Sequence, residues 1–173
     1  MATAAKKPPP VLLVTHPACV EHEILNHPEQ PARLGSIVEA VEKAFGPQLI
    51  VDRNPPAATE KQLAYFHTPK HIRKVQQACA RAESIHGKML KKHGASALIS
   101  SPKGDALRRK LEVEIDGDTA VMAGSREAAL RAAGGAIAAV DAVLTGRASS
   151  AFCAVRPPGR KFRLLLYTHP LRN

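Results

Sequence analysis

The sequence contains no Trp, and aromatic residues make up only 3% of its 173 residues. Hydrophobic residues still account for 45%, so the core must be built mainly from Ala, Val, Leu and Ile. Such side chains bury less area than aromatic ones, and we therefore expect a small margin of stability. The length fits one domain.

Cysteine and long apolar runs are also scarce. Three cysteines, Cys19, Cys79 and Cys153, argue against a disulfide framework and favour a reducing compartment. No run approaches the roughly 18 apolar residues of a membrane span. The run Val11–Val14 is too short for the centre of a signal peptide. We expect a nuclear or cytoplasmic protein that has no membrane partner.

Acidic residues are outnumbered, 15 against 25 Lys and Arg, which gives a formal charge of +10. This excess allows weak nonspecific binding of nucleic acid or of acidic tails, although a solvated basic surface is the favoured explanation. No basic cluster is interleaved with aromatics, so a platform for base stacking is not apparent. The clusters are Lys91–Lys92, Arg108–Lys110 and Arg160–Arg163.

The apolar pattern predicts strands that alternate with helices. Met1–Pro10, rich in Pro and Lys, is expected to be a disordered tail, and the polar stretch His86–Asp105 a long loop with some helix. Asp118–Thr119 is the expected cap of the longest helix. The strands are expected at Val11–Thr15, Leu49–Val51 and Ala151–Val155, and the helices at Pro31–Phe45, Glu60–Phe66, Pro69–Glu83 and Ala120–Thr145.

This order indicates an α/β fold with a parallel sheet covered on both faces. In such sheets, ligands bind beyond the carboxyl ends of the strands. The candidate site therefore comprises the loop His16–Pro31 and the segment from Arg156 onward. Gly134–Gly135 weaken their helix by about 1 kcal/mol per Gly relative to Ala. The missing side chains would permit a close approach to a sheet or another helix.

Five motifs, in the same order along the chain, resemble the histone deacetylase and acetylpolyamine amidohydrolase superfamily. The resemblance is to its class II members. The similarity covers residues 11–159, and the middle loop is its weakest part. The resemblance implies a partial parallel-sheet, arginase-like deacetylase fold, truncated after about three strands. The motifs are His16–His22 with His27–Leu34, Asp116–Thr119, Gly124–Leu130, Ala132–Gly135 with Val140–Asp141 and Gly146, and Val155–Gly159.

The family hydrolyses acetyl-lysine amides with a zinc ion that polarises the carbonyl and activates water. Two adjacent histidines follow the Pro-Pro-Gly of the family motif. An Asp-x-His pair and a further Asp bind the metal, and a later Tyr completes the oxyanion site. Here Gly159 is followed by Arg160-Lys161-Phe162, and no family pattern is found in residues 160–173. Arg cannot act as a base, and Lys161 lies beside another positive charge.

These departures predict a truncated, inactive family member with no catalytic residue, no metal ligand and no cofactor. Residues 160–173 are read as an unrelated basic tail that arose by a frameshift, an alternative splice or an incorrect gene structure. Two alternatives stay open. One is a non-catalytic binding protein that acts on chromatin or on a full-length relative, and the other is a fragment of an active deacetylase that acts on acetylated protein or histone tails.

The resemblance also marks remnants of a substrate pocket. Arg33 matches the Arg that lines the family's internal channel, and Asp118 and Thr119 fall near a rim position. Pro157, Pro158 and Gly159 would form part of one wall. Each has a structural alternative, which is a helix-surface residue for Arg33, a helix cap for Asp118–Thr119 and a stiff loop for the prolines.

Two rival sites deserve comparison. Zinc-binding residue types occur in one loop, although their spacing matches no recognised finger and the resemblance explains them as loop residues. Cys153 lies within an apolar strand, where a thiol is usually inert packing. The candidate zinc ligands are His16, Cys19, His22 and His27.

A parallel sheet cut after three strands should leave an unpaired edge and an uncovered apolar face. We therefore expect aggregation or a need for a partner. Leu164–Tyr167 in the tail offers a makeshift extra strand.

Overall fold

The computed structural model describes residues 10–98, 101–117 and 119–159. The expected N-terminal tail, apart from Pro10, lies outside the described residues. The basic segment 160–173, with its expected strand Leu164–Tyr167, lies outside them as well.

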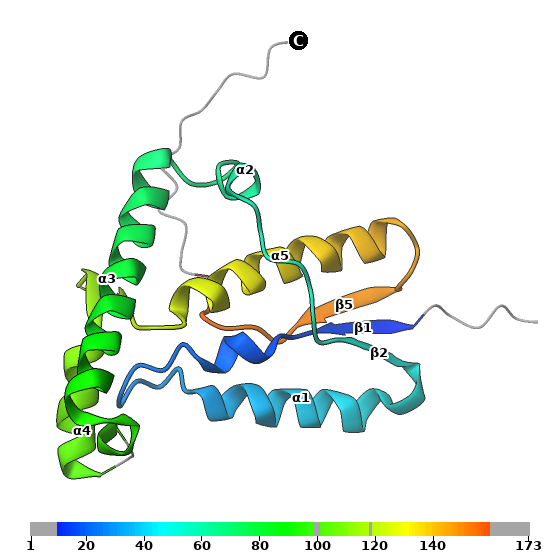
Figure 1. The fold of residues 1–173 in the computed structure, drawn as a ribbon. Helices are drawn as coiled ribbons and strands as arrows, with labels where there is room; N and C mark the ends of the chain where they lie inside the picture. The colour runs from blue at the N-terminus through cyan, green and yellow to red at the C-terminus, as the bar shows by residue number, and fades with distance from the viewer. Residues whose placement is uncertain (1–9, 99–100, 118, 160–173) are drawn as a thin grey trace, which may run out of the picture.

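A three-stranded parallel sheet forms the centre of the fold (Figure 1). Its strands are β1 (Val11–Val14), β2 (Leu49–Asp52) and β5 (Ser150–Cys153), in the order β2-β1-β5. Leu13 of β1 is in register with Val51 on one side and with Phe152 on the other. The parallel sheet predicted from the three apolar runs is confirmed.

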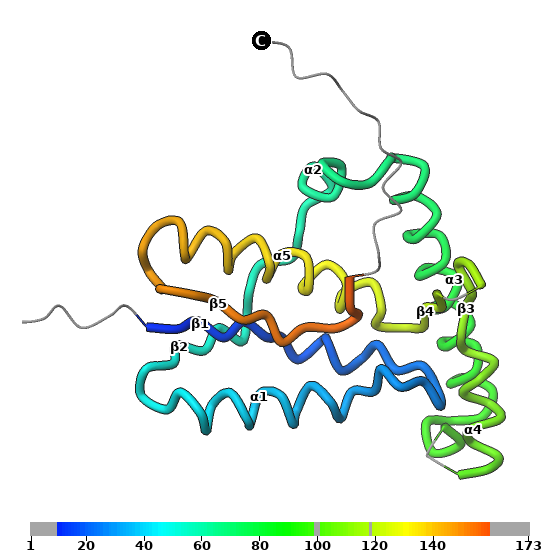
Figure 2. The backbone as a smooth tube through the Cα atoms, turned by 180° about the vertical axis from the view of Figure 1, so that it is seen from behind, coloured from blue at the N-terminus to red at the C-terminus, as the bar shows by residue number. Residues whose placement is uncertain are grey.

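Helices lie on both faces of the sheet, α1 (Pro31–Phe45) on one and α5 (Ser125–Leu144) on the other (Figures 1 and 2). On the α1 side, Leu13 and Leu34 are buried together; on the α5 side, Leu12 and Val14 pack against small residues of α5 such as Ala139. Period-2 alternation along β1 thus serves two cores. The expectation of an uncovered apolar face was wrong.

The edge strands keep some apolar exposure. Ile50 of β2 is 47% exposed and Phe152 of β5 is 46% exposed. The run Ala151–Val155 is apolar enough for a fully buried strand, but β5 is partly exposed because it is an edge strand of the described sheet and has β1 on one side. Its apolar composition alone could not distinguish an edge from a centre.

A second, smaller core lies beside the sheet. The long helix α3 (Pro69–His93) packs on an antiparallel hairpin of β3 (Val113–Asp116) and β4 (Thr119–Val121). Cys79 and Ala82 of α3 are buried there with Val113 and Val121. Two further helices complete the described fold, α2 (Glu60–Leu63) and α4 (Pro102–Arg108), with short 3-10 turns at Pro17–Val20, Gly46–Gln48, Ala95–Leu98 and Arg109–Leu111.

Several predicted element boundaries need correction. Helix α3 continues ten residues beyond Glu83, so the expected loop at His86–Asp105 is instead the end of α3, a 3-10 turn and α4. Helix α2 ends at Leu63 rather than Phe66. The apolar pattern predicts a helix from Ala120, but Thr119–Val121 forms β4 because Val121 is buried against α3.

The longest predicted helix therefore begins at Ser125, five residues after its predicted start at Ala120. Its N-cap is Gly124, whose φ of +89° lies in the left-handed region that favours glycine. Thr119 was expected to cap this helix, and that expectation was wrong because Thr119 lies in β4. Asp118, the other expected cap residue, lies outside the described residues.

The glycine pair of α5 permits the close approach that its sequence suggested. A Cβ at Gly134 would overlap the Pro56 carbonyl oxygen, and one at Gly135 would lie 3.0 Å from Cγ1 of Val14. The segment that crosses Gly134 is fixed to α5, because the Ala58 N–H donates to the Leu130 carbonyl at 2.9 Å. Glycine at 134 and 135 lets α5 touch both this segment and the sheet.

None of the helices in the described part of the chain is both long enough and apolar enough to cross a bilayer.

Replacing Gly134 by Ala should destabilise the fold by about 3 kcal/mol or more, because the new methyl group meets backbone atoms that cannot rotate away. Gly87→Ala is the matched control. It lies within α3 with nothing within 4 Å of the new Cβ, and should stabilise the fold by roughly 1 kcal/mol. Urea denaturation measures both changes. Equal effects of the two substitutions would contradict the close contact.

Candidate functional site

The carboxyl ends of β1 and β5 lie next to each other, and the loop after each strand begins there. We call this end of the sheet the carboxyl edge. The Ala154 N–H donates to the Val14 carbonyl at 2.8 Å, and the Thr15 N–H donates to the Asp52 carbonyl of β2 at 2.9 Å. The two loops that the sequence marked as the candidate site are therefore neighbours.

Arg156 joins these two loops. It follows β5, is only 3% exposed, and donates to the carbonyl oxygens of His22 at 2.8 Å and Glu29 at 2.5 Å. Both acceptors belong to the loop after β1. Burial and the nearby Arg33 guanidinium lower its pKa, but an arginine stays charged at neutral pH. A forked, permanently charged donor thus holds two backbone carbonyls that would otherwise lose hydrogen-bonding partners.

The Glu29 carboxylate balances part of this charge. One of its oxygens lies 3.9 Å from Nε of Arg156, and the other forms an ion pair with Arg33. Arg33 is in the first turn of α1, and its side chain is half exposed. One carboxylate therefore lies between two guanidinium groups, which links α1 to the segment after β5.

A buried pair joins the same loop to the start of α5. Nδ1 of His22 lies 2.8 Å from Oγ of Ser125, and both residues are buried. That Oγ also accepts the Met122 N–H at 2.9 Å. Burial, and then the positive charges of Arg156 and His27, lower the pKa of His22 to about 4. The imidazole is neutral at physiological pH, and in the tautomer with the proton on Nε2 its Nδ1 accepts a hydrogen bond from the Ser125 hydroxyl.

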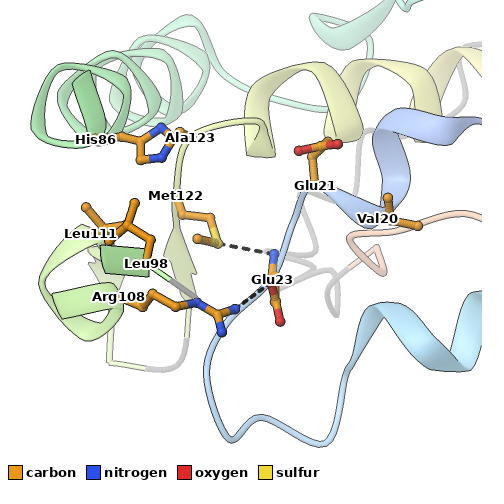
Figure 3. A pocket seen from close by; sticks show the side chains of 9 residues that line it. All are labelled: Val20, Glu21, Glu23, His86, Leu98, Arg108, Leu111, Met122 and Ala123. Carbon is orange, nitrogen blue, oxygen red and sulfur yellow. Dashed lines mark hydrogen bonds and ion pairs between the residues drawn. The ribbon is translucent and has the colours of Figure 1, made fainter. Parts of the chain in front are cut away.

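A cavity of about 200 Å³ opens between this loop and the second core (Figure 3). Glu23 and Arg108, which line it, form an ion pair at 2.6 Å. The Glu23 N–H also contacts Sδ of Met122 at 3.2 Å. Because its carboxylate is already paired, Glu23 is poorly suited to act as a base here. The other lining residues are Val20, Glu21, His86, Leu98, Leu111, Met122 and Ala123.

A smaller hollow of about 80 Å³ lies between α1 and the end of β5. Its lining includes Arg33, Ile37, Phe152, Val155 and Arg156. Arg33 is thus close to the segment that leads to Pro157. Its expected role as a channel residue stays a prediction, as its present contact is the ion pair with Glu29.

The remaining predicted pocket residues are spread over two regions. Pro157 is half-buried and Gly159 is exposed, as is Pro158 between them; all three follow Arg156. Thr119 is half-buried in β4, and Asp118 lies outside the described residues. Residues that sequence reasoning left out of the site, Ser125 and Arg108, make its polar contacts. Arg156 was named only as the start of the candidate segment and as part of a motif, and nothing in its sequence context signals that it is buried.

The candidate zinc ligands of the first loop are held by other contacts. Nδ1 of His16 accepts the Ala18 N–H, Nδ1 of His27 accepts the Glu29 N–H, and His22 contacts Ser125. Cys19 is buried, and burial raises the pKa of its thiol. Nowhere in residues 10–98, 101–117 and 119–159 do three His, Cys, Asp or Glu side chains gather as a metal-binding group. The donors in this part of the chain do not fit the zinc ion of the deacetylase family.

Cys153 shows none of the features that activate a thiol. Burial raises its pKa, and its Sγ lies 3.9 Å from the Gly135 carbonyl on the α5 side of the sheet. A reactive cysteine needs a lowered pKa, so packing explains this residue better than nucleophilic chemistry does.

Comparisons with known proteins agree with the motifs. The family model described as "Histone deacetylase domain" matches residues 27–160. Type-2 histone deacetylase 1 of Dictyostelium discoideum is 29% identical over 170 residues, which cover 86% of this chain but 11% of that protein. A probable deacetylase of Archaeoglobus fulgidus is 29% identical, over 85% of this chain and 33% of its own length.

A solved structure shares the fold. The crystal structure of the HDA15 HD domain superposes with a TM-score of 0.63 at 21% identity, covering 87% of this chain and 36% of that one. The predicted partial deacetylase fold is confirmed. The chain spans at most about a third of the length of these relatives.

Replacing Arg156 by Leu should destabilise the fold by about 2–4 kcal/mol, because the buried carbonyl of His22 and the partly buried carbonyl of Glu29 lose their donor. Arg156→Lys should recover only part of this loss, since one ammonium lacks the planar fork. The exposed Arg147, replaced by Leu, is the control and should change the stability by about 0.5 kcal/mol or less. Urea denaturation gives the three values. An Arg156→Leu chain as stable as the control would refute this role.

The low pKa of His22 predicts acid sensitivity. The folded state favours the neutral ring, whereas an unfolded His titrates near 6.5, so its stabilisation is complete above that pH and is lost as the pH falls toward 4. The loss should approach roughly 3 kcal/mol. His22→Asn should lower stability at pH 7 and flatten the profile between these pH values, while the exposed His93→Asn should keep the wild-type profile. Parallel wild-type and His22→Asn profiles would contradict the assignment. Chemical denaturation at a series of pH values makes this comparison.

Proposed function

The chain belongs to the histone deacetylase family, and from this premise we propose that the 173-residue chain is a non-catalytic deacetylase-like domain. The observation that carries the proposal is the pair Arg160–Lys161, which stands where the family resemblance expects two adjacent histidines. A guanidinium stays protonated at neutral pH, so Arg160 cannot act as the base in the proton transfer.

The described site supports the same proposal. The polar groups at the carboxyl edge hold the chain together: Arg156 binds two carbonyls, His22 contacts Ser125, and Glu23 pairs with Arg108. A catalytic base needs a free lone pair and a pKa near the working pH, and a metal site needs several converging donors. The neutral His22 has its Nδ1 engaged with Ser125 and lies in the interior. These residues suit a scaffold better than a reaction centre.

Partners and location remain proposals. Acetylated protein or histone tails and a full-length relative are the partners implied by the family. A nuclear or cytoplasmic location accords with the free cysteines Cys19, Cys79 and Cys153. The alternative is that the chain is a fragment of an active deacetylase. This alternative predicts that the active protein hydrolyses acetyl-lysine.

The purified chain should release no acetate from an acetyl-lysine peptide above the background rate, with or without added zinc. Arg160→His/Lys161→His should be equally inactive, because the donors in the described part of the chain do not fit zinc. An active deacetylase assayed in parallel serves as the positive control. Acetate release that a chelator abolishes, by the unmodified chain, would overturn the proposal and support the active fragment.

A further inference from the structure

The outer face of α3 carries a continuous row of positive charge. The helix contains seven Lys and Arg residues and one acidic residue, Glu83. At 3.6 residues per turn, all seven cations fall within an arc of about 100°. Each is exposed: Lys70, Arg73, Lys74, Arg81, Lys88, Lys91 and Lys92. We call this row the α3 basic stripe.

Packing fixes the direction of this stripe. The opposite side of α3 buries Cys79 and Ala82, with Val75 and Ile85 packed around them against the hairpin of β3 and β4. Both views place α3 at one margin of the molecule (Figures 1 and 2). The helix cannot rotate without opening this second core, so the stripe is held outward. The buried apolar side is also unable to insert into a membrane surface.

The charge of the stripe is uncompensated within the described residues. The ion pairs found there involve Arg33, Arg53, Arg108, Arg131 and Arg156, and none of the seven stripe cations. Several stripe residues are three or four positions apart, as are Lys70 and Lys74 or Lys88 and Lys92. Like charges at this spacing repel and destabilise a helix. A bound polyanion would relieve that repulsion.

We propose that the α3 basic stripe binds the phosphate backbone of double-stranded nucleic acid without sequence preference. The stripe from Lys70 to Lys92 is about 33 Å long and straight, and a duplex offers a similarly rigid row with one negative charge per about 1.7 Å of axis. The cations stand in regular succession along the helix. This arrangement matches a repeating anion better than a single charged group.

The composition of the stripe selects among polyanions. Its face contains no aromatic residue, so it offers no platform on which the bases of a single strand could stack. The exposed residues between the cations, Gln77, Ala80 and Ser84, are small or polar and offer no large apolar side chain. An acidic peptide would find charge but no anchor for side chains. Contacts to phosphates alone fit the available groups.

This activity does not depend on the proposed loss of catalysis. The stripe lies on α3, and the altered residues Arg160 and Lys161 follow β5. A chain that deacetylated a peptide could still bind a duplex, and a chain without catalysis could fail to do so. The two proposals are therefore tested separately.

The test measures fluorescence anisotropy of a labelled DNA duplex of about 20 base pairs, titrated with the full chain between about 50 and about 200 mM salt. The unmodified chain should bind, and its affinity should fall steeply with salt. Lys74→Gln/Arg81→Gln removes two central cations. It should lower the slope of log affinity against log salt by roughly 2, so the loss over this range becomes roughly tenfold smaller.

The matched control is Lys43→Gln/Arg147→Gln, which removes two exposed cations from other surfaces and the same total charge. It should keep the slope of the unmodified chain, and circular dichroism should show all three chains equally folded. Equal slopes for the stripe and control variants would overturn the proposal. A polyglutamate peptide of matched charge that bound as tightly as the duplex would also overturn the choice of nucleic acid.

Discussion

The buried guanidinium of Arg156 is the group on which the carboxyl edge of the sheet depends. It belongs to the segment after β5, yet both carbonyls that it binds belong to the loop after β1, more than a hundred residues away in the sequence. Burying a charge is costly unless it is paired and hydrogen-bonded. Two carbonyls and the Glu29 carboxylate supply that compensation, so the strand, the loop and α1 must be placed together.

The contacts of Arg156 also account for the structural roles of the other polar groups at the carboxyl edge. Arg156 keeps a positive charge beside His22, which adds to burial in disfavouring the protonated ring. The neutral ring then joins the start of α5 through Ser125. Polar groups that a reaction would need in the free state are engaged in holding loops in place. A domain with few aromatics relies on such contacts, because small side chains such as Ala139 and Ala142 bury little area.

Two surfaces of the chain follow different physical rules. At the carboxyl edge, the charge of Arg156 is buried and lies beside the Glu29 carboxylate, and its role is structural. On α3, charges are exposed and unpaired within the described residues, and their role depends on what lies outside the molecule. The proposed loss of catalysis rests on Arg160 and Lys161, and the proposed binding of nucleic acid rests on α3. The two proposals therefore concern different parts of the chain.

The sequence alone determined the family, the parallel sheet and the limits of α1, because these depend on local apolar patterns and on motifs such as Val155–Gly159. It did not determine β3 and β4, since Thr119–Val121 has a helical pattern and forms a strand only through the burial of Val121 against α3. The sequence pattern also placed Lys88, Lys91 and Lys92 in a loop. It therefore did not predict that they lie on the same face of α3 as Lys70 and Arg81. The burial of Arg156 was equally hidden, because an arginine becomes an interior residue only when carbonyls distant in the chain converge on it. Local patterns determined the strands of the parallel sheet and α1, whereas tertiary packing decided that β4 forms and where the charges lie.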